Sequence, residues 1–186
     1  IAGANIASFS ENVAMFAATT DATIDNTAMS FGRIAQLTGE GQQSFGNIGA
    51  SIYEVGVNSV ATESQILKMS QEIAAAANIA GYSAAEVIGL SAALSSLGVQ
   101  PERARGAIQA IFANISKEVD VAGERLNAFA RTSGMSASEF QKAWKEDAAG
   151  TFNALLQGMS GVEAAGGNVN MVLGEMGIKN IRAVDM

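Results

Sequence analysis

The sequence predicts an all-α protein, built as a compact array of short antiparallel helices (helical hairpins) with no sheet. Three observations predict this fold. Apolar residues recur at steps of three and four along nearly the whole chain, which is the spacing of one face of an α-helix. Short joints place helix-stop and helix-start residues back to back. No run of β-branched residues alternates with polar ones at period two, so strands are not expected.

Successive helical segments follow when the apolar spacing is read along the chain. In the first segment Ile6, Phe9 and Val13 step by three and four, and the same steps return in every long segment. Each segment therefore presents one apolar stripe that needs a partner. The apolar series run over residues 6–16, 31–37, 45–55, 66–80, 87–97, 108–119, 126–129, 140–144, 152–159 and 169–176.

The joint at 81–87 contains a helix stop and a helix start within seven residues. Gly81 suits the left-handed position that ends a helix. Ser83 is the expected N-cap of the next helix, and Glu86 completes a capping box with it. Tyr82 and Val87 flank this pair as a hydrophobic staple. The chain is therefore expected to turn back on itself here.

Other joints repeat this pattern with small changes. The stretch from Gly134 through Ser136 and Glu139 has the same residue types at the same spacing. At 97–105, Gly98 ends one helix and Pro101, the only proline, begins the next, where its missing N–H costs nothing. Two further helix starts are expected, a Thr62/Gln65 capping box and an Asp147 N-cap. The looser stretch 160–170 and residues 57–61, the expected hinge, contain no such signal.

The chain is expected to divide into two parts of different character. Residues 1–57 form a Gly-punctuated helical segment, either extended or packed on the rest, and residues 58–186 form a compact multi-helix domain. The first 61 residues hold one base, Arg33, against five acids. Because the chain starts without Met and ends in what reads as mid-helix, we expect it to be an excerpt of a longer protein.

The composition excludes several classes of function. A net charge of −7 argues against general binding to a phosphate backbone, which needs clustered Lys and Arg. The chain has no Cys and no His, so disulfides, thiolate metal sites and the commonest general base are absent. We therefore expect no cofactor, no metal site and no catalytic residue. Charged residues make up only 16%, which predicts a surface that is either rich in Ser, Asn, Gln and Thr or partly covered by other chains.

Three acidic residues are candidates for a catalytic role. Glu139, Glu146 and Asp147 could provide paired carboxylates for acid–base work. They alternate with Lys142 and Lys145, so an ion-paired, solvated helix face is the preferred interpretation.

Arg103 and Arg105 could grip a phosphate at the start of a helix, but Glu102 lies beside them and no glycine-rich loop precedes them. Trp144 is expected in the core, and the glycine cluster 39–49 is expected to form a helix–helix loop.

Residues 73–99 contain a single charge, Glu86, and raise the possibility of membrane contact. A span needs about 20 predominantly apolar residues. Gly81 and Ser83 interrupt this run at its middle, and Ala and Ser outnumber Leu. A buried helical hairpin is therefore the preferred interpretation, with a membrane-interacting module as the alternative.

From about Asn58 to the end, the chain resembles phage tail tape measure proteins. The residues that show the resemblance are 58–104 (ending "SLGVQPERA"), 128–159 (containing "MSASEFQKAWKEDAAGTF") and 173–186 ("LGEMGIKNIRAVDM"). Residues 1–57 fit the family less distinctly. The resemblance implies a virion structural protein, encoded by a phage or prophage, that acts in tail assembly, tail-length determination and DNA ejection. It implies no enzymatic activity and supplies no catalytic residues.

The resemblance also implies partners and a location. Members lie in the lumen of the phage tail, pass through the host cytoplasm during assembly and reach the host envelope during infection. The expected partners are further copies of the chain, tail-tube, baseplate or tail-tip proteins and tail assembly chaperones, with the host membrane as a further contact. No specific nucleic acid binding is expected.

Overall fold

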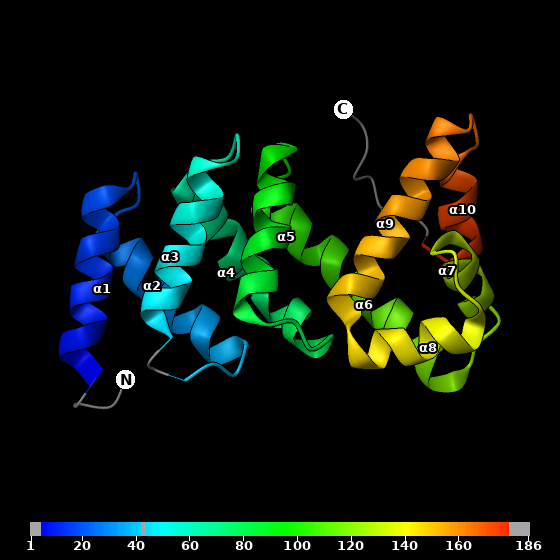
Figure 1. The fold of residues 1–186 in the computed structure, drawn as a ribbon, viewed down its shortest axis with the longest axis horizontal. Helices are drawn as coiled ribbons and strands as arrows, with labels where there is room; N and C mark the ends of the chain where they lie inside the picture. The colour runs from blue at the N-terminus through cyan, green and yellow to red at the C-terminus, as the bar shows by residue number, and fades with distance from the viewer. Residues whose placement is uncertain (1–4, 42–43, 179–186) are drawn as a thin grey trace. The chain divides into compact units, whose positions relative to one another are not determined.

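The computed structural model describes residues 5–41 and 44–178 and is helical in these ranges, with no strand (Figure 1). The all-α prediction is confirmed. The helices are α1 (Ile6–Thr19), α2 (Ile24–Leu37), α3 (Phe45–Val57), α4 (Glu63–Ile79), α5 (Ala84–Ser96), α6 (Pro101–Val121), α7 (Leu126–Thr132), α8 (Ala137–Glu146), α9 (Ala148–Ala164) and α10 (Val169–Glu175).

The chain forms two compact units, residues 1–108 and 109–186, and the division falls inside α6. Helices α1 to α5 of the first unit share one apolar core, because side chains from both sides of residue 57 are buried together. The predicted division at 57/58 rests on composition and stays a prediction. The contacts of the folded chain place the boundary between the two units about fifty residues later, at 108/109.

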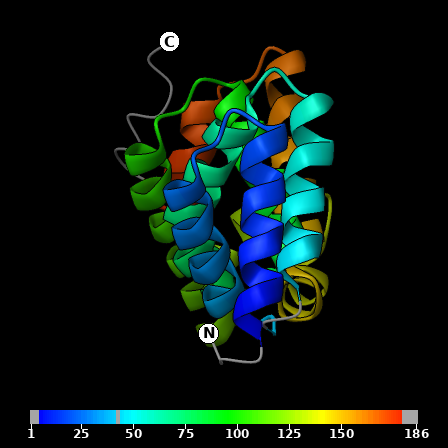
Figure 2. The ribbon, with the colours of Figure 1, turned by 90° about the vertical axis from the view of Figure 1, so that its left-hand side faces the viewer.

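In the first unit, α4 and α5 form the most closely packed hairpin, and α2 and α3 lie against it. Helix α1 lies beside α2 and α3 (Figure 2). The core is made by large apolar side chains spaced at three and four: Val13, Phe16, Phe31, Ile34, Phe45, Ile48, Ile52, Ile66, Leu67 and Ile88.

Two acids in the loops between the first three helices cap later helices. Asp21, in the turn after α1, accepts hydrogen bonds from the Ser64 N–H at 2.8 Å and the Ser64 hydroxyl at 2.6 Å. Glu40 Oε1 accepts from the Ala84 N–H at 3.1 Å, in the first turn of α5. Carboxylates are favourable at helix N-termini, where backbone N–H groups are unpaired. These acids therefore tie the acidic start of the chain to the α4–α5 hairpin.

An aromatic cluster organises the second unit. The Phe112 ring lies edge-on to Trp144 and Phe152, with centroids 5.7 and 5.1 Å away. Phe129 and Phe140 stack at 6.1 Å. These rings come from α6, α7, α8 and α9, so four helices meet around one cluster of the kind that stabilises cores beyond area burial alone. Trp144 is buried, as predicted, and its Nε1–H donates to the Ser116 hydroxyl at 3.2 Å.

The predicted joints are confirmed. Gly81, Gly98 and Gly134 have φ of +79°, +73° and +71°, the left-handed conformation that ends a helix. The capping boxes at Thr62/Gln65, Ser83/Glu86 and Ser136/Glu139 are present, and Asp147 accepts from the Gly150 N–H. Pro101 is the first residue of α6. At each of the three glycine joints the next residue donates its N–H back to a carbonyl five residues earlier, a Schellman motif.

Two predictions of loop boundaries need correction. Residues 160–164, predicted as loose, complete α9, because a helical glycine such as Gly161 costs only about 1 kcal/mol and does not by itself end a helix. Residues 45–49 of the predicted 39–49 loop are the first turn of α3. Helix α2 begins at Ile24, where Thr23 caps it, and so extends seven residues before the apolar series at 31–37. Residues 42–43, and residues 179–186 of the last stretch resembling the tape measure family, lie outside the described residues.

Candidate functional site

The most distinctive polar cluster of the second unit lies where α6 ends. Ala122 has φ of +48°, the one positive φ outside glycine in the described part of the chain, and the Gly123 N–H donates to the Glu118 carbonyl at 2.9 Å. The end of α6 is thus a Schellman motif with alanine where glycine is preferred. A Cβ built on Gly123 would lie 2.0 Å from Glu118 Oε2, so a larger residue there would require the Glu118 carboxylate to move.

Glu118 is a buried acid, with its side chain only 8% exposed. Its Oε2 accepts a hydrogen bond from the Arg125 N–H at 3.2 Å, and its Oε1 lies 3.9 Å from Arg125 Nη1. A buried charge is costly unless it is paired and hydrogen-bonded, and here one arginine supplies both contacts. The carboxylate therefore fixes the turn between α6 and α7.

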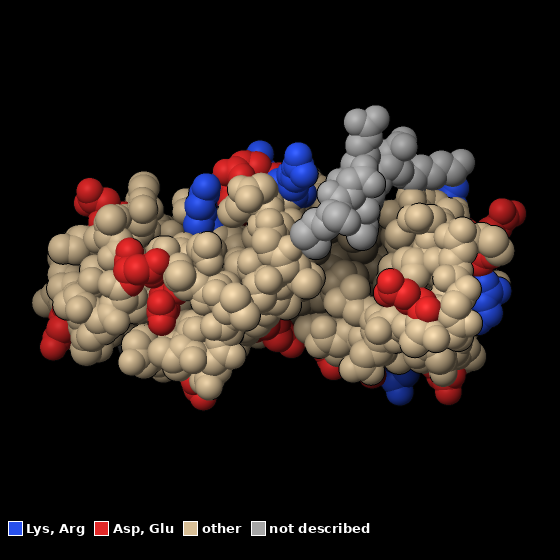
Figure 3. Space-filling view, turned by 90° about the horizontal axis from the view of Figure 1, so that it is seen from above, with Lys and Arg blue, Asp and Glu red and all other residues tan. Residues whose placement is uncertain are grey.

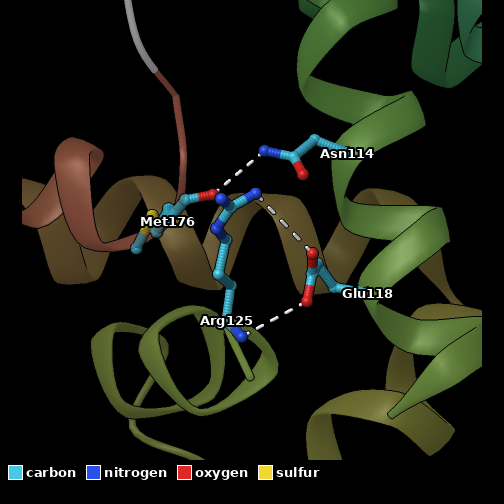
Figure 4. A network of polar contacts seen from close by, with 4 residues as sticks. All are labelled: Asn114, Glu118, Arg125 and Met176. Atoms are coloured by element: carbon cyan, nitrogen blue, oxygen red, sulfur yellow. Dashed lines mark hydrogen bonds and ion pairs between the residues drawn. The ribbon is translucent and has the colours of Figure 1, made fainter. Parts of the chain in front are cut away.

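The same cluster reaches the C-terminal helix of the unit (Figure 4). The Asn114 amide of α6 donates to the Met176 carbonyl at 2.9 Å. The Arg125 guanidinium packs on Gly177, where a built Cβ would lie 2.6 Å from the guanidinium carbon. Arg131 of α7 is paired with Glu175 of α10. Side chains from α6, α7 and the turn between them therefore converge on residues 175–177.

The side chains of this cluster connect different segments of the second unit to one another. It contains carboxylates, guanidinium groups and an amide, all engaged with one another or with backbone groups. Among residues 5–41 and 44–178, no group of three or more His, Cys, Asp or Glu side chains is arranged to hold a metal ion.

The three carboxylates singled out in the sequence serve separate local structures. Glu139 accepts from the Ser136 N–H at 2.8 Å and the Ser136 hydroxyl at 2.6 Å, and the hydroxyl bond is the main cause that lowers the pKa of Glu139. Glu146 pairs with Lys142 at 4.0 Å on an exposed face, as predicted, and Asp147 caps α9. Two of the three are therefore engaged in capping α8 and α9.

The two arginines considered for phosphate binding lie at the start of α6. Arg105 Nη1 is 3.2 Å from Glu72 Oε2 of α4. The two side chains attract each other by charge without a hydrogen bond, because Glu72 Oε2 has no hydrogen-bond partner. Lys68 and Glu102 make a parallel α4–α6 pair at 3.2 Å. Arg105, one of the two arginines considered for phosphate and not favoured for it, thus faces an acid of its own unit.

Sequence reasoning missed the cluster around Glu118. One signal was available, because Glu118 lies three residues after Ile115 and beside Val119, on the apolar face of its helix. A charge at such a position requires a buried partner. The partner itself, Arg125, could not be identified from spacing, since the intervening turn has no recognised stop glycine at position 122.

The membrane alternative can be compared with the helices directly. Within the described residues, none of the helices has both the length and the apolar character needed to cross a bilayer. In the 73–99 hairpin, Ile73, Val87 and Ile88 are buried.

The described residues are helical, and their notable polar groups join segments of the chain itself. The sequence model of the family described as "Phage-related minor tail protein" matches residues 1–176, and the chain belongs to this family. It is accordingly a virion-associated protein with a structural role in the tail. No curated protein and no solved structure matches the chain. The predicted resemblance is thus confirmed at the level of a phage tail family.

Proposed function

We propose that this chain is a folded helical region of a tape measure protein, acting in tail assembly, tail-length determination and DNA ejection. The observation that supports it most is the family match over residues 1–176, together with the tape measure-like stretches at 58–104 and 128–159. The proposed partners are further copies of the chain, tail-tube, baseplate or tip proteins and tail assembly chaperones. The proposed location is the tail lumen.

The surface suits a protein that is covered by other chains. Much of the face drawn in Figure 3 has neither basic nor acidic side chains. Several large apolar side chains are also exposed, with Val60 reaching 90%. Exposed apolar groups are common one by one, but a low charge content with many of them favours association. Those in the first unit are Ile6, Met15, Ile24, Met29, Tyr53, Val57, Val60, Ile79 and Leu97.

The direct test is made in the phage that encodes the chain. An in-frame duplication of the segment corresponding to residues 62–178 is expected to lengthen the tails measured by electron microscopy, and an in-frame deletion is expected to shorten them. Tails of unchanged length in both mutants would contradict a role in length determination.

The partner proposal has its own test. Size-exclusion chromatography with light scattering is expected to show self-association of the 186-residue chain or a complex with tail-tube protein. A chain that stays monomeric and does not bind tube protein would argue against the proposed partners. Liposome flotation tests the membrane alternative, which predicts lipid association at some pH or ionic strength.

A further inference from the structure

Helix α10 is attached to the second unit in an unusual way. None of its residues, 169–175, is buried. The one side chain that fixes it in the apolar interior is Met176, which follows the helix and is 0% exposed. A seven-residue helix is far too short to be stable in isolation, so its order depends on what holds it in place.

Half-buried Val169, Val172 and Leu173 pack α10 against the unit, and polar contacts hold its C-terminal end. Asn114 donates to the Met176 carbonyl, Arg125 packs on Gly177, and Arg131 pairs with Glu175. The side chains of Arg131 and Glu175 are 69% and 41% exposed, so salt screens their attraction. The attachment thus combines one fully buried apolar side chain, three half-buried ones and an ion pair open to solvent.

The core of the unit does not depend on this attachment. The aromatic cluster is built from α6, α7, α8 and α9, and no ring from α10 enters it. The Glu118–Arg125 contact likewise joins α6 to the turn before α7. The ring contacts and the Glu118–Arg125 contact therefore involve no side chain of α10.

We propose that residues 169–178 form a releasable clasp, which opens and closes as one piece while α6 to α9 stay folded. Opening withdraws Met176 from its site and frees Arg131 and the Asn114 amide for other partners. Added salt weakens the clasp through the Arg131–Glu175 pair. Regions with few buried apolar contacts are the ones that open below the global unfolding free energy. The clasp does not depend on the proposed tape measure role.

Native-state hydrogen exchange on the full 186-residue chain, read by mass spectrometry, tests the clasp. Peptides covering 169–178 are expected to exchange much faster than those covering 110–120 and 140–156. Raising NaCl from low to 1 M is expected to accelerate exchange in 169–178 about 2- to 5-fold and to leave the other peptides unchanged. Exchange of all these peptides at one common rate, or no effect of salt on 169–178, would overturn the proposal.

Variants separate the contacts. Arg131→Ala is expected to accelerate exchange of 169–178 about 2- to 5-fold and to abolish its salt dependence. Asn114→Ala is expected to accelerate exchange of 169–178 about 3- to 10-fold. Met176→Ala is expected to accelerate it more than about 30-fold. Lys142→Ala, which breaks the exposed Lys142–Glu146 pair elsewhere in the unit, is the matched control and is expected to have no effect.

Exchanging the charges of Arg131 and Glu175 distinguishes loss of their ion pair from misfolding of a single variant. Arg131→Glu and Glu175→Arg are each expected to accelerate exchange of 169–178, and the double variant is expected to restore the rate and its salt dependence. A double variant that stays as fast as the single ones would contradict the assigned pair. Equal rates for 169–178 in Asn114→Ala, Arg131→Ala and Lys142→Ala would overturn the clasp.

Discussion

Gly158 of α9 lies directly against the backbone carbonyl of Thr132, the last residue of α7. A Cβ built on Gly158 would come within 1.6 Å of the Thr132 oxygen and 2.7 Å of its carbon. Since the obstacle is backbone rather than a flexible side chain, no rotamer change can relieve it. The two helices therefore meet at a distance that only glycine allows.

Gly158→Ala is expected to destabilise the second unit by more than about 2 kcal/mol, because α7 and α9 must move apart. The measurement is urea unfolding followed by Trp144 fluorescence, since Trp144 is the only tryptophan and lies in this unit. Gly161→Ala, in the same helix with nothing within 4 Å, is the control and is expected to gain up to about 1 kcal/mol. Equal effects of the two variants would contradict the close approach.

Ala122→Gly is expected to stabilise the second unit by about 1 kcal/mol. Alanine pays a steric cost at the observed φ of +48°, and glycine does not. The same substitution at Ala113, an exposed position inside α6, is expected to cost about 1 kcal/mol instead. Opposite signs for the two variants in the same unfolding assay are the expected result, and matching signs would show that Ala122 is unstrained.

Gly98→Val is expected to destabilise the first unit by more than about 1 kcal/mol. Nothing lies within 4 Å of a Cβ built there, so the effect isolates the left-handed backbone at φ +73°. Gly89→Ala, also in open space but inside α5, is expected to be stabilising. Circular dichroism during thermal unfolding measures both. A Gly98→Val variant as stable as the wild type would mean that the joint can change its conformation freely.

Trp144→Ala is expected to cost about 3–5 kcal/mol, because it leaves a cavity beside Phe112 and Phe140. Trp144→Phe keeps most of the packing but loses the hydrogen bond to Ser116, and about 1–2 kcal/mol is expected. Circular dichroism in urea provides the readout, since the fluorescent residue is removed. A loss below about 1 kcal/mol for Trp144→Ala would place the ring outside the core.

The unfolding free energy is expected to fall as pH drops below about 4.5, the ordinary pKa of a glutamate. Hydrogen bonds from Ser136 lower the pKa of Glu139 in the folded chain. For Asp21, burial pushes the pKa upward, but hydrogen bonds from Ser64 and Thr62 outweigh it and lower the pKa.

A depressed folded pKa means that each carboxylate stabilises the fold above its unfolded pKa, and that this stability is lost as pH falls through the folded value. Urea midpoints between pH 7 and 3 measure it. Glu139→Gln keeps the acceptor of the capping box but cannot titrate, so its midpoint is expected to fall less steeply than that of the wild type. Identical slopes would contradict the role of the Glu139 charge.

The sequence predicted those parts of the fold that local chemistry decides. The Gly81–Ser83–Glu86 joint is complete within six residues, so a single stretch contains all of its determinants. The tie from Asp21 to Ser64 spans 43 residues and depends on how helices pack, which periodicity cannot supply. The polar cluster around Glu118 was not predicted for the same reason, since Asn114 and Met176 are 62 residues apart in the sequence.

Errors at helix ends have a related cause. Glycines 161 and 167 look alike in the sequence, yet the first continues α9 and the second lies beyond its end. The sequence alone does not distinguish them, because the cost of one helical glycine is small enough for a helix to continue through it. At position 122 the opposite occurs. Helix α6 ends there although the residue is alanine and not the glycine that usually marks a helix end.

The Schellman ends have a consequence for how the chain acquires its structure. Each reversal is closed by hydrogen bonds that reach back no more than five residues, so corners can form before distant faces have met. Proteins dominated by such near-neighbour contacts fold in microseconds to milliseconds. The helix reversals are therefore early folding steps, whereas contacts such as Asp21–Ser64 form only when distant helices have met.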